Sequence, residues 1–141
     1  MTAGEIIVWI HLLATWFMVG LVWFVQCIHY PLLRDLPPEI VPTYQKAHVR
    51  RTSPMIPVVM VGEAVTGLML LFPAVSPIAI ANLALLVGVW LTTFALIVPV
   101  HERLCRQHEP MLVTRLLRLN LLRSILWLVH GFTALALVLA K

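Results

Sequence analysis

The sequence predicts an all-α, polytopic membrane protein: a bundle of four transmembrane helices with short interfacial segments. Hydrophobic residues make up 61% and charged residues 11% of the 141-residue chain, a composition too apolar for a soluble domain with one core. Four apolar runs occupy residues 6–28, 55–72, 78–100 and 119–140, each close to the ~20 residues that cross a bilayer as a helix. The length fits one compact unit, so we expect residues 1–141 to form a single domain.

Each run has its own signals. We expect residues 6–28 to be a retained span and not a signal peptide, because they lack a basic leader, are too long and have no small-residue cleavage site. Residues 43–51 are expected to form a short interfacial helix before the second run. The second and third runs are separated only by "PAVSP", residues 73–77, whose prolines indicate a tight antiparallel hairpin. Pro110 suits a first helical turn, so the helix that contains the fourth run begins there.

The basic residues predict an orientation. Of the ten Lys and Arg residues, eight lie in the connections 29–53 and 101–118, and Arg123 lies just inside the fourth run. Only Lys141 belongs to the opposite face. The positive-inside rule therefore places both connections in the cytoplasm and both termini outside it. The net charge of +4 is then a topology signal, and we expect the lipid bilayer as a partner and no nucleic acid.

Ionisable side chains inside the runs indicate a polar interior. The only acid of the second run, Glu63, and His130 of the fourth come out level near the midplane, beside Met18, when depth is counted at ~1.5 Å per residue. A charge at mid-bilayer costs at least a few kcal/mol, so Glu63 is either protonated or paired, with His130 as the first candidate partner. Asn120 and Arg123 share a helical face with His130.

Two further groups of polar residues lie at other depths. His11 and Asn82 come out level with each other in the outer third. Asn82 is typical of hydrogen bonding between helices, whereas His11 is either a hydrogen-bonded bundle histidine or a ligand. His29, His48 and His101 gather at the inner boundary, where they either bind a ligand or mark the point at which the bundle meets water.

Neutral imidazoles on neighbouring helices commonly hold haem b iron, copper or non-haem iron. On this basis the first hypothesis is a haem- or metal-dependent oxidoreductase whose polar interior opens to the cytoplasmic side. The chain has no HExxH, Glu-x-x-His or CxxCH motif, so the sequence permits a metal without requiring one. The predicted metal ligands are His29, His48 and His101, and the predicted catalytic groups are Glu63, His130 and Arg123.

Two alternatives stay open at this point. A cofactor-free module that binds or transports a lipophilic molecule predicts the same polar interior without a metal. In that case Arg50, Arg51 and Arg123 suit an anionic or carboxylated amphiphile, with histidine and Glu63 moving protons. An accessory subunit of a larger membrane complex, or a homo-oligomer, would instead use the outer faces of the helices.

Five short stretches together resemble an uncharacterised family of small four-span bacterial membrane proteins, and the resemblance covers nearly the whole chain. They are "CIHYPLL", "YQKAHVRRTS", "VGEAVTGLMLL", "VPVHERL" and "LNLLRSILW". The resemblance implies a location in the bacterial inner membrane but implies no activity. It also implies site residues, with His29, Tyr30, Arg51 and Asn120 as the cofactor-binding set beside His48, Glu63, His101, Glu102 and Arg123.

A looser resemblance points towards redox chemistry. The stretch "HLLATWFMVGLVWF" followed by His29 is similar to the first span of the haem-binding membrane protoporphyrinogen oxidase and of copper-resistance-type membrane proteins. "PVHERL" followed by "LNLLRS" resembles anthrone-oxygenase-like four-helix proteins. These likenesses imply haem b or a transition metal as the cofactor.

Overall fold

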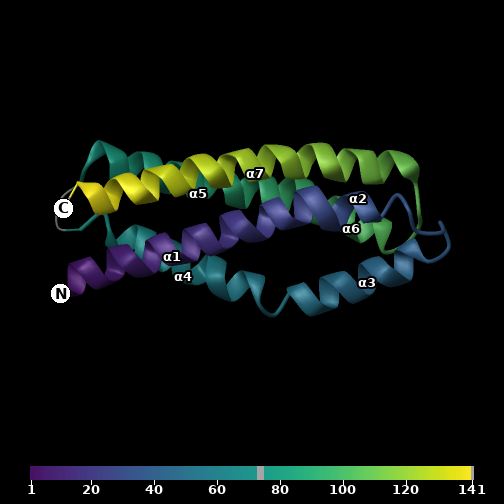
Figure 1. Cartoon of the computed structure of the whole chain (residues 1–141), viewed down its shortest axis with the longest axis horizontal. Coiled ribbons are helices and arrows are strands. Elements are labelled where there is room, and N and C mark those ends of the chain that lie inside the picture. The colour runs from purple at the N-terminus through teal and green to yellow at the C-terminus, as the bar shows by residue number, and fades with distance from the viewer. Residues whose placement is uncertain (73–74, 141) are drawn as a thin grey trace.

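The chain folds as a bundle of helices that run along one common axis, with both termini at the same end (Figure 1). The computed structural model describes residues 1–72 and 75–140, and this part of the chain contains no strand. Its elements are α1 (Ala3–Phe24), η1 (Val25–His29), α2 (Tyr30–Leu32), α3 (Val41–Thr52), α4 (Ile56–Met69), α5 (Pro77–Leu91), η2 (Thr92–Ile97), α6 (Val98–Leu104) and α7 (Pro110–Leu139).

Three helical stretches are long and apolar enough to cross a membrane: Ala3–Leu32, Pro77–Leu104 and Pro110–Leu139. A fourth crossing needs α3 and α4 together, since the two helices meet at a bend of 42°. Alone, the 14 residues of α4 would extend only about 21 Å, less than the ~30 Å of hydrocarbon. The predicted helical membrane bundle is confirmed, with three crossings or four if the bent pair is one span.

The second span differs from its predicted form. The run 55–72 was expected to be a whole span, but α4 ends at Met69 and depends on α3 for its length. The expected short helix at 43–51 is present as α3, and it runs along the bundle as part of this broken span (Figure 1). Pro54 lies in the turn between the two helices and has no backbone N–H to continue the hydrogen bonding. In the predicted 73–77 hairpin, positions 73 and 74 lie outside the described residues.

Two of the helices begin at side-chain caps. Thr2 Oγ1 accepts a hydrogen bond from the Glu5 backbone N–H at 3.3 Å, and Glu5 Oε2 accepts one from the Thr2 N–H at 2.7 Å. This reciprocal pair satisfies donors that the first turn of a helix cannot use. Ser76 caps α5 through the Ala79 N–H. The predicted helix start at Pro110 is confirmed, because α7 begins there.

Two of the long helices contain a π-helical turn. In η1 the Tyr30 N–H donates to the Val25 carbonyl, and directly after η2 the Val98 N–H donates to the Thr93 carbonyl. Both bonds span five residues in place of four. Turns of this kind occur frequently at functional sites, and here both adjoin the pocket described below.

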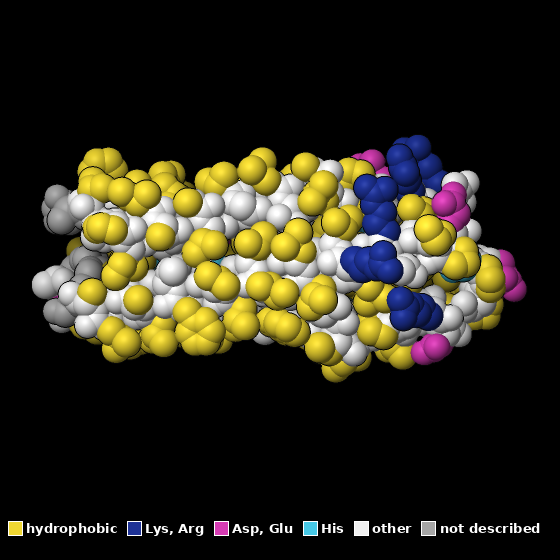
Figure 2. Space-filling view, turned by 90° about the horizontal axis from the view of Figure 1, so that it is seen from above, with side chains coloured by type: hydrophobic (Ala, Val, Ile, Leu, Met, Phe, Trp, Pro, Cys, Tyr) yellow, Lys and Arg dark blue, Asp and Glu magenta, His cyan; other side chains and the backbone are white. Residues whose placement is uncertain are grey.

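The surface is apolar along most of its length. Leu13, Val58 and Leu91 are 68%, 70% and 63% exposed, although a soluble bundle would bury such residues. Lys and Arg side chains gather near the end of the bundle opposite the termini (Figure 2). This distribution is that of an integral membrane protein with one basic end. Which side of the membrane that end faces stays a prediction.

Candidate functional site

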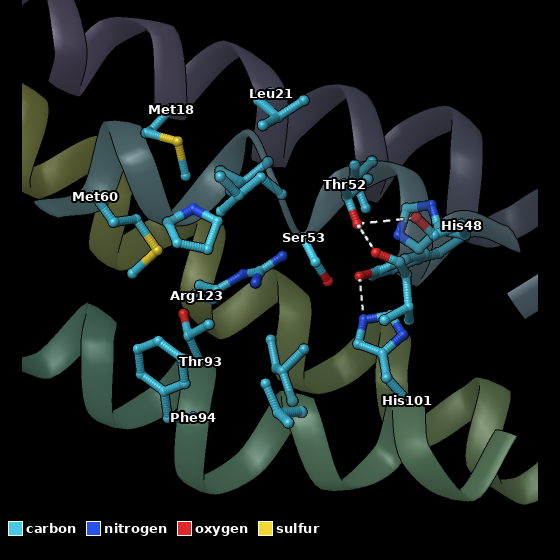
Figure 3. A pocket seen from close by; sticks show the side chains of 18 of the residues that line it. Met18, Leu21, His48, Thr52, Ser53, Met60, Thr93, Phe94, His101 and Arg123 are labelled. Atoms are coloured by element: carbon cyan, nitrogen blue, oxygen red, sulfur yellow. Dashed lines mark hydrogen bonds between the residues drawn. The ribbon is translucent and has the colours of Figure 1, made fainter. Parts of the chain in front are cut away.

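A pocket of about 280 Å³ opens between α1, α4, η2 and α7 in the basic half of the bundle, with α3 and α6 at its edge (Figure 3). Most of its wall is apolar and includes Met18, Val25, Met60, Phe94, Ile97 and Trp127. A smaller polar part comes from Thr52, Ser53, His48, His101 and Arg123. Pockets that are mostly apolar with a few convergent polar groups are the usual form of small-molecule sites.

Arg123 is the cation of this pocket. Its guanidinium points from α7 into the space between Ser53 and the apolar wall (Figure 3). Its Nη2 donates to Asn120 Oδ1 at 2.5 Å, and the guanidinium also interacts with the Tyr30 hydroxyl. Its Nε is buried without a hydrogen-bond partner. Neither neighbour carries a negative charge, so nothing among its contacts neutralises the guanidinium.

No carboxylate of the described chain pairs with Arg123. In residues 1–72 and 75–140 the contact between His130 and Glu63 is the only one within ion-pair distance. Glu102 also lines the pocket, but it is exposed to solvent and makes no ion pair. Since a half-buried guanidinium without a counter-ion is costly, the pocket is electrostatically suited to an anion.

Asn120 sets the orientation of Arg123. This buried amide donates from Nδ2 to Gln26 Oε1 at 2.8 Å, which turns its Oδ1 towards the guanidinium. Ser124 Oγ bonds the Asn120 carbonyl at 2.8 Å on the same helix. The resemblance implied a binding role for Asn120. In the structure Asn120 does not line the pocket but forms a hydrogen bond with Arg123, which does.

The three histidines predicted as metal ligands do lie together. The rings of His29 and His48 stack with centroids 4.3 Å apart, and the His48 and His101 rings stack at 5.7 Å. Each pair is tilted by only 25°. Because the nitrogen lone pairs of imidazole lie in the ring plane, stacked rings direct them side by side and not towards one shared point.

The hydrogen bonds of His101 also oppose metal binding. Its Nδ1 accepts from the Gln45 amide, so Nε2 carries the proton and contacts the Tyr30 hydroxyl at 2.8 Å. A ligating imidazole needs one free lone pair, and in this arrangement His101 has none. Across the described residues, no three or more His, Cys, Asp or Glu side chains are placed to hold a metal ion. The residues as arranged do not fit a three-histidine metal or haem site.

Of the other residues predicted to bind a cofactor, Tyr30 lines the pocket and Arg51 does not. Tyr30 is buried and lines the pocket, where it contacts both His101 and Arg123. Arg51 is exposed and does not line it. Cys105, which the sequence did not single out, lies at the rim, where burial raises the pKa of its thiol and Lys46 opposes this shift.

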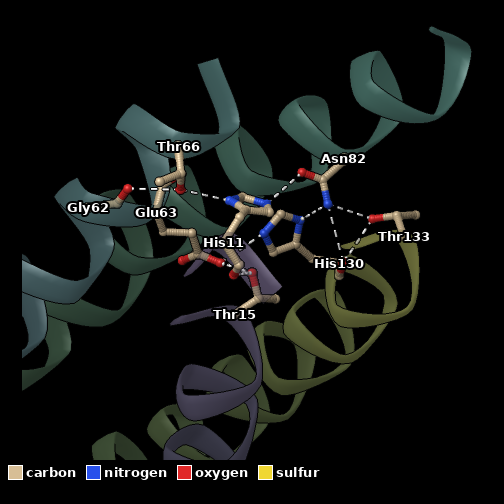
Figure 4. Close-up of polar contacts among 8 residues, drawn as sticks. All are labelled: His11, Thr15, Gly62, Glu63, Thr66, Asn82, His130 and Thr133. Atoms are coloured by element: carbon tan, nitrogen blue, oxygen red, sulfur yellow. Dashed lines mark hydrogen bonds and ion pairs between the residues drawn. The ribbon is translucent and has the colours of Figure 1, made fainter. Parts of the chain in front are cut away.

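A second polar site lies deeper in the bundle and confirms the pairing predicted for Glu63. His130 Nε2 and Glu63 Oε1 are 3.0 Å apart, and both side chains are 0% exposed. Thr15 Oγ1 donates to the same carboxylate oxygen at 2.6 Å. Glu63 Oε2 has no partner. The carboxylate therefore receives two donors on one oxygen and none on the other (Figure 4).

Asn82 connects the two buried histidines. Its Oδ1 accepts from His11 Nε2 at 3.0 Å, while its Nδ2 donates to His130 Nδ1 at 3.1 Å and to Thr133 Oγ1 at 2.9 Å. His11 Nδ1 meets the Thr66 hydroxyl at 3.0 Å. Since His130 Nδ1 accepts, the proton of the neutral ring is on Nε2, directed at Glu63. Four helices thus contribute to one hydrogen-bonded network, hereafter the central network: His11, Thr15, Glu63, Thr66, Asn82, His130 and Thr133.

The prediction that His11 and Asn82 lie level with each other is confirmed by their hydrogen bond, but their predicted separation from Glu63 and His130 is wrong. They were placed in a separate outer layer, but both belong to the central network with Glu63 and His130. The helices extend past the apolar runs by unequal lengths, so counting from the ends of the runs misjudges the level. Gly67 allows the approach, because a Cβ there would lie 3.3 Å from His11 Cε1.

An apolar layer separates the pocket from the central network. Met18, Met60 and Trp127 line the pocket, and each lies three residues from a network member along its own helix. That spacing is about 4.5 Å of rise. The rings of Trp127 and His130 are 5.7 Å apart. The two polar sites are therefore neighbours without sharing a hydrogen bond.

Sequence reasoning missed several residues of both sites. Gln45 forms a hydrogen bond with His101, and Thr66 forms one with His11. Thr133 Oγ1 accepts a hydrogen bond from the Asn82 amide. The sequence could have indicated Thr66, because it follows Glu63 by three residues and so lies on the same helical face. No sequence feature indicated Gln45, since it belongs to a polar segment that the hydropathy pattern assigns to the interface.

Comparisons with known proteins add no family to this geometry. No family description, curated protein sequence or solved structure matches the chain. The motif resemblances described above therefore stay expectations, and the function is argued from the residues of the two sites.

Proposed function

We propose that this integral membrane protein binds an amphipathic molecule with one anionic group in the pocket beside Arg123. The observation that carries the proposal is the Arg123 guanidinium itself, which faces an apolar pocket and has no carboxylate partner. A carboxylate, sulfonate or phosphate would supply the missing charge through charge-assisted hydrogen bonds. Thr52 and Ser53 provide hydroxyl groups at the same polar side.

The rest of the pocket favours a hydrocarbon tail. Met18, Met60 and Phe94 lie on the side of Arg123 away from His48 and His101 (Figure 3). Methionine adapts to irregular apolar ligands because its chain is unbranched and flexible. A volume of about 280 Å³ is near the lower limit of ordinary ligand pockets, which favours a short or medium-length chain over a whole two-chain lipid.

The pocket also has a direction in the bundle. Its polar rim lies towards the basic end and its apolar floor towards the central network. A bound amphiphile would thus have its charged group at the basic end and its tail towards the middle of the membrane. If the basic end faces the cytoplasm, as the positive-inside rule predicts, the ligand enters from the cytoplasmic leaflet or from the cytoplasm.

Binding of decanesulfonate to the protein in lipid nanodiscs tests this proposal. Native mass spectrometry should show one adduct per chain, and decanol should not compete at equal concentration. Arg123→Gln should weaken binding roughly 10- to 150-fold, the range expected for a lost hydrogen bond to a charged group. Arg118→Gln is the matched control, because Arg118 is an exposed arginine of the same helix.

Two results would refute the proposal. Equal affinity of the wild type and Arg123→Gln would mean that the anion binds elsewhere. Equal weakening by Arg118→Gln would mean that only the general positive field of the basic end attracts it. Arg123→Lys is expected to retain part of the affinity, because it keeps the charge but loses the two-pronged geometry.

A further inference from the structure

The interior of the bundle holds two opposite charges that do not touch. Glu63 is the only buried carboxylate among the described residues, and Arg123 is the cation of the pocket. The layer of Met18, Met60 and Trp127 lies between them. In a low-dielectric interior opposite charges attract each other across such a gap.

One carboxylate oxygen of Glu63, Oε2, has no hydrogen-bond partner and can accept a proton. Both of its donors, His130 Nε2 and Thr15 Oγ1, are directed at Oε1, whereas Oε2 is buried without a partner. An ionised Glu63 is therefore hydrogen-bonded on one oxygen, and protonation at Oε2 breaks none of these bonds. The carboxylate can gain or lose a proton without rearrangement of the network.

The other titratable groups facing Glu63 are His11 from α1 and His130 from α7, while α5 contributes only the Asn82 amide. A second proton on His130 would require Nδ1 to bear hydrogen, but Asn82 Nδ2 already donates to that atom. His11 differs, because its Nε2 donates to Asn82 Oδ1 and its Nδ1 faces the Thr66 hydroxyl. The fixed amide therefore directs an added proton to Glu63 rather than to His130.

We propose that binding of the anion beside Arg123 is coupled to uptake of one proton at Glu63. The coupling rests on the proposed function of the pocket. In the ligand-free protein, the guanidinium has no counter-ion in contact with it, and the Glu63 carboxylate attracts it only across the apolar layer. A bound anion neutralises Arg123 and leaves Glu63 as an uncompensated buried charge. Solvent then supplies a proton, an O–H bond forms at Oε2, and the interior becomes neutral again.

Proton uptake is measured with a pH-indicator dye in weakly buffered nanodisc suspensions on addition of decanesulfonate. A sulfonate stays anionic, so any proton taken up is bound by the protein and not by the ligand. The expected result is up to one proton per bound ligand for the wild type and none for Glu63→Gln, which keeps the side-chain shape. Glu109→Gln, an exposed acid, is the matched control and should behave as the wild type.

Linkage gives a second readout in binding alone. If one proton accompanies the anion, the Kd of decanesulfonate should rise about tenfold per pH unit wherever the ligand-free Glu63 is ionised and the bound form is protonated. The Kd of Glu63→Gln should be independent of pH over the same range. Infrared spectroscopy of the wild type should show a protonated carboxylic acid on ligand addition, and this band should be missing in Glu63→Gln.

The outcomes separate the two proposals. Failure of decanesulfonate to bind would overturn the proposed function and the coupling with it. Binding that depends on Arg123 but takes up no proton would overturn the coupling alone, and so would uptake that persists in Glu63→Gln. Should Glu63→Gln not fold, the infrared band and the pH dependence of the wild-type Kd still decide.

Discussion

Replacement of the buried Asn82 by a leucine should lower the free energy of unfolding of the bundle, because it removes the hydrogen bonds that join two buried histidines. Asn82→Leu removes three hydrogen bonds of 3.1 Å or less, to His11, His130 Nδ1 and Thr133, together with a longer contact of 3.4 Å to the His130 carbonyl. At the average of ~0.6 kcal/mol for hydrogen bonds within membrane proteins, the three contribute about 2 kcal/mol to the free energy of unfolding. His11 Nε2 and His130 Nδ1 would also be left buried without partners, at about 1–3 kcal/mol for each such group. We therefore expect a loss of about 4–8 kcal/mol.

Reversible unfolding by denaturing detergent in mixed micelles, followed by circular dichroism, measures this loss. Thr93→Val is the control, because the Thr93 hydroxyl bonds only to the Val89 carbonyl of its own helical segment, at 2.8 Å. That variant should change the free energy by less than ~1 kcal/mol. If Asn82→Leu costs no more than Thr93→Val, the central network does not stabilise the fold and the reasoning from its geometry is refuted.

Two further predictions concern the basic half of the molecule and its orientation. Because burial raises the pKa of the Cys105 thiol, its thiolate fraction at neutral pH is reduced, so alkylation in a Cys27→Ser background should be slower than that of a free thiol. The rate should rise with pH, and a rate equal to that of a free thiol would contradict the expected shift. A reporter fused after residue 141 should be active only outside the cytoplasm, whereas cytoplasmic activity would reverse every assignment of sides made from the basic residues.

The sequence was most informative where chemistry and depth coincide. Glu63 and His130 could be paired in advance, because an acid at the middle of an apolar run needs a partner and few side chains are available at that level. Arg123 could be placed in the polar interior for a related reason, since an arginine inside a run is costly unless something contacts it. Burial cost thus predicts which residues matter even without knowledge of the packing.

The directions in which side chains point could not be predicted from the sequence. The clustering of His29, His48 and His101 followed from their positions, but the stacking of the rings did not. Whether a histidine can ligate depends on which nitrogen is already bonded, and for His101 that was decided by Gln45 in another segment. The bend between α3 and α4 was equally hidden, because hydropathy reports the length of an apolar run and not the angle at which two helices meet.

The π-helical turn η2 makes the orientation of the pocket residues that follow it depend on the number of residues in that turn. The run Thr92–Ile97 carries one residue more per turn than an α-helix would, and His101 follows it on the same continuous helix. If this stretch relaxed to regular α-geometry with its present number of residues, every residue after it would be rotated by about 100°. His101 would then turn away from Tyr30, while the hydropathy of the span would hardly change. In this segment the number of residues, independent of their identity, is itself part of the site.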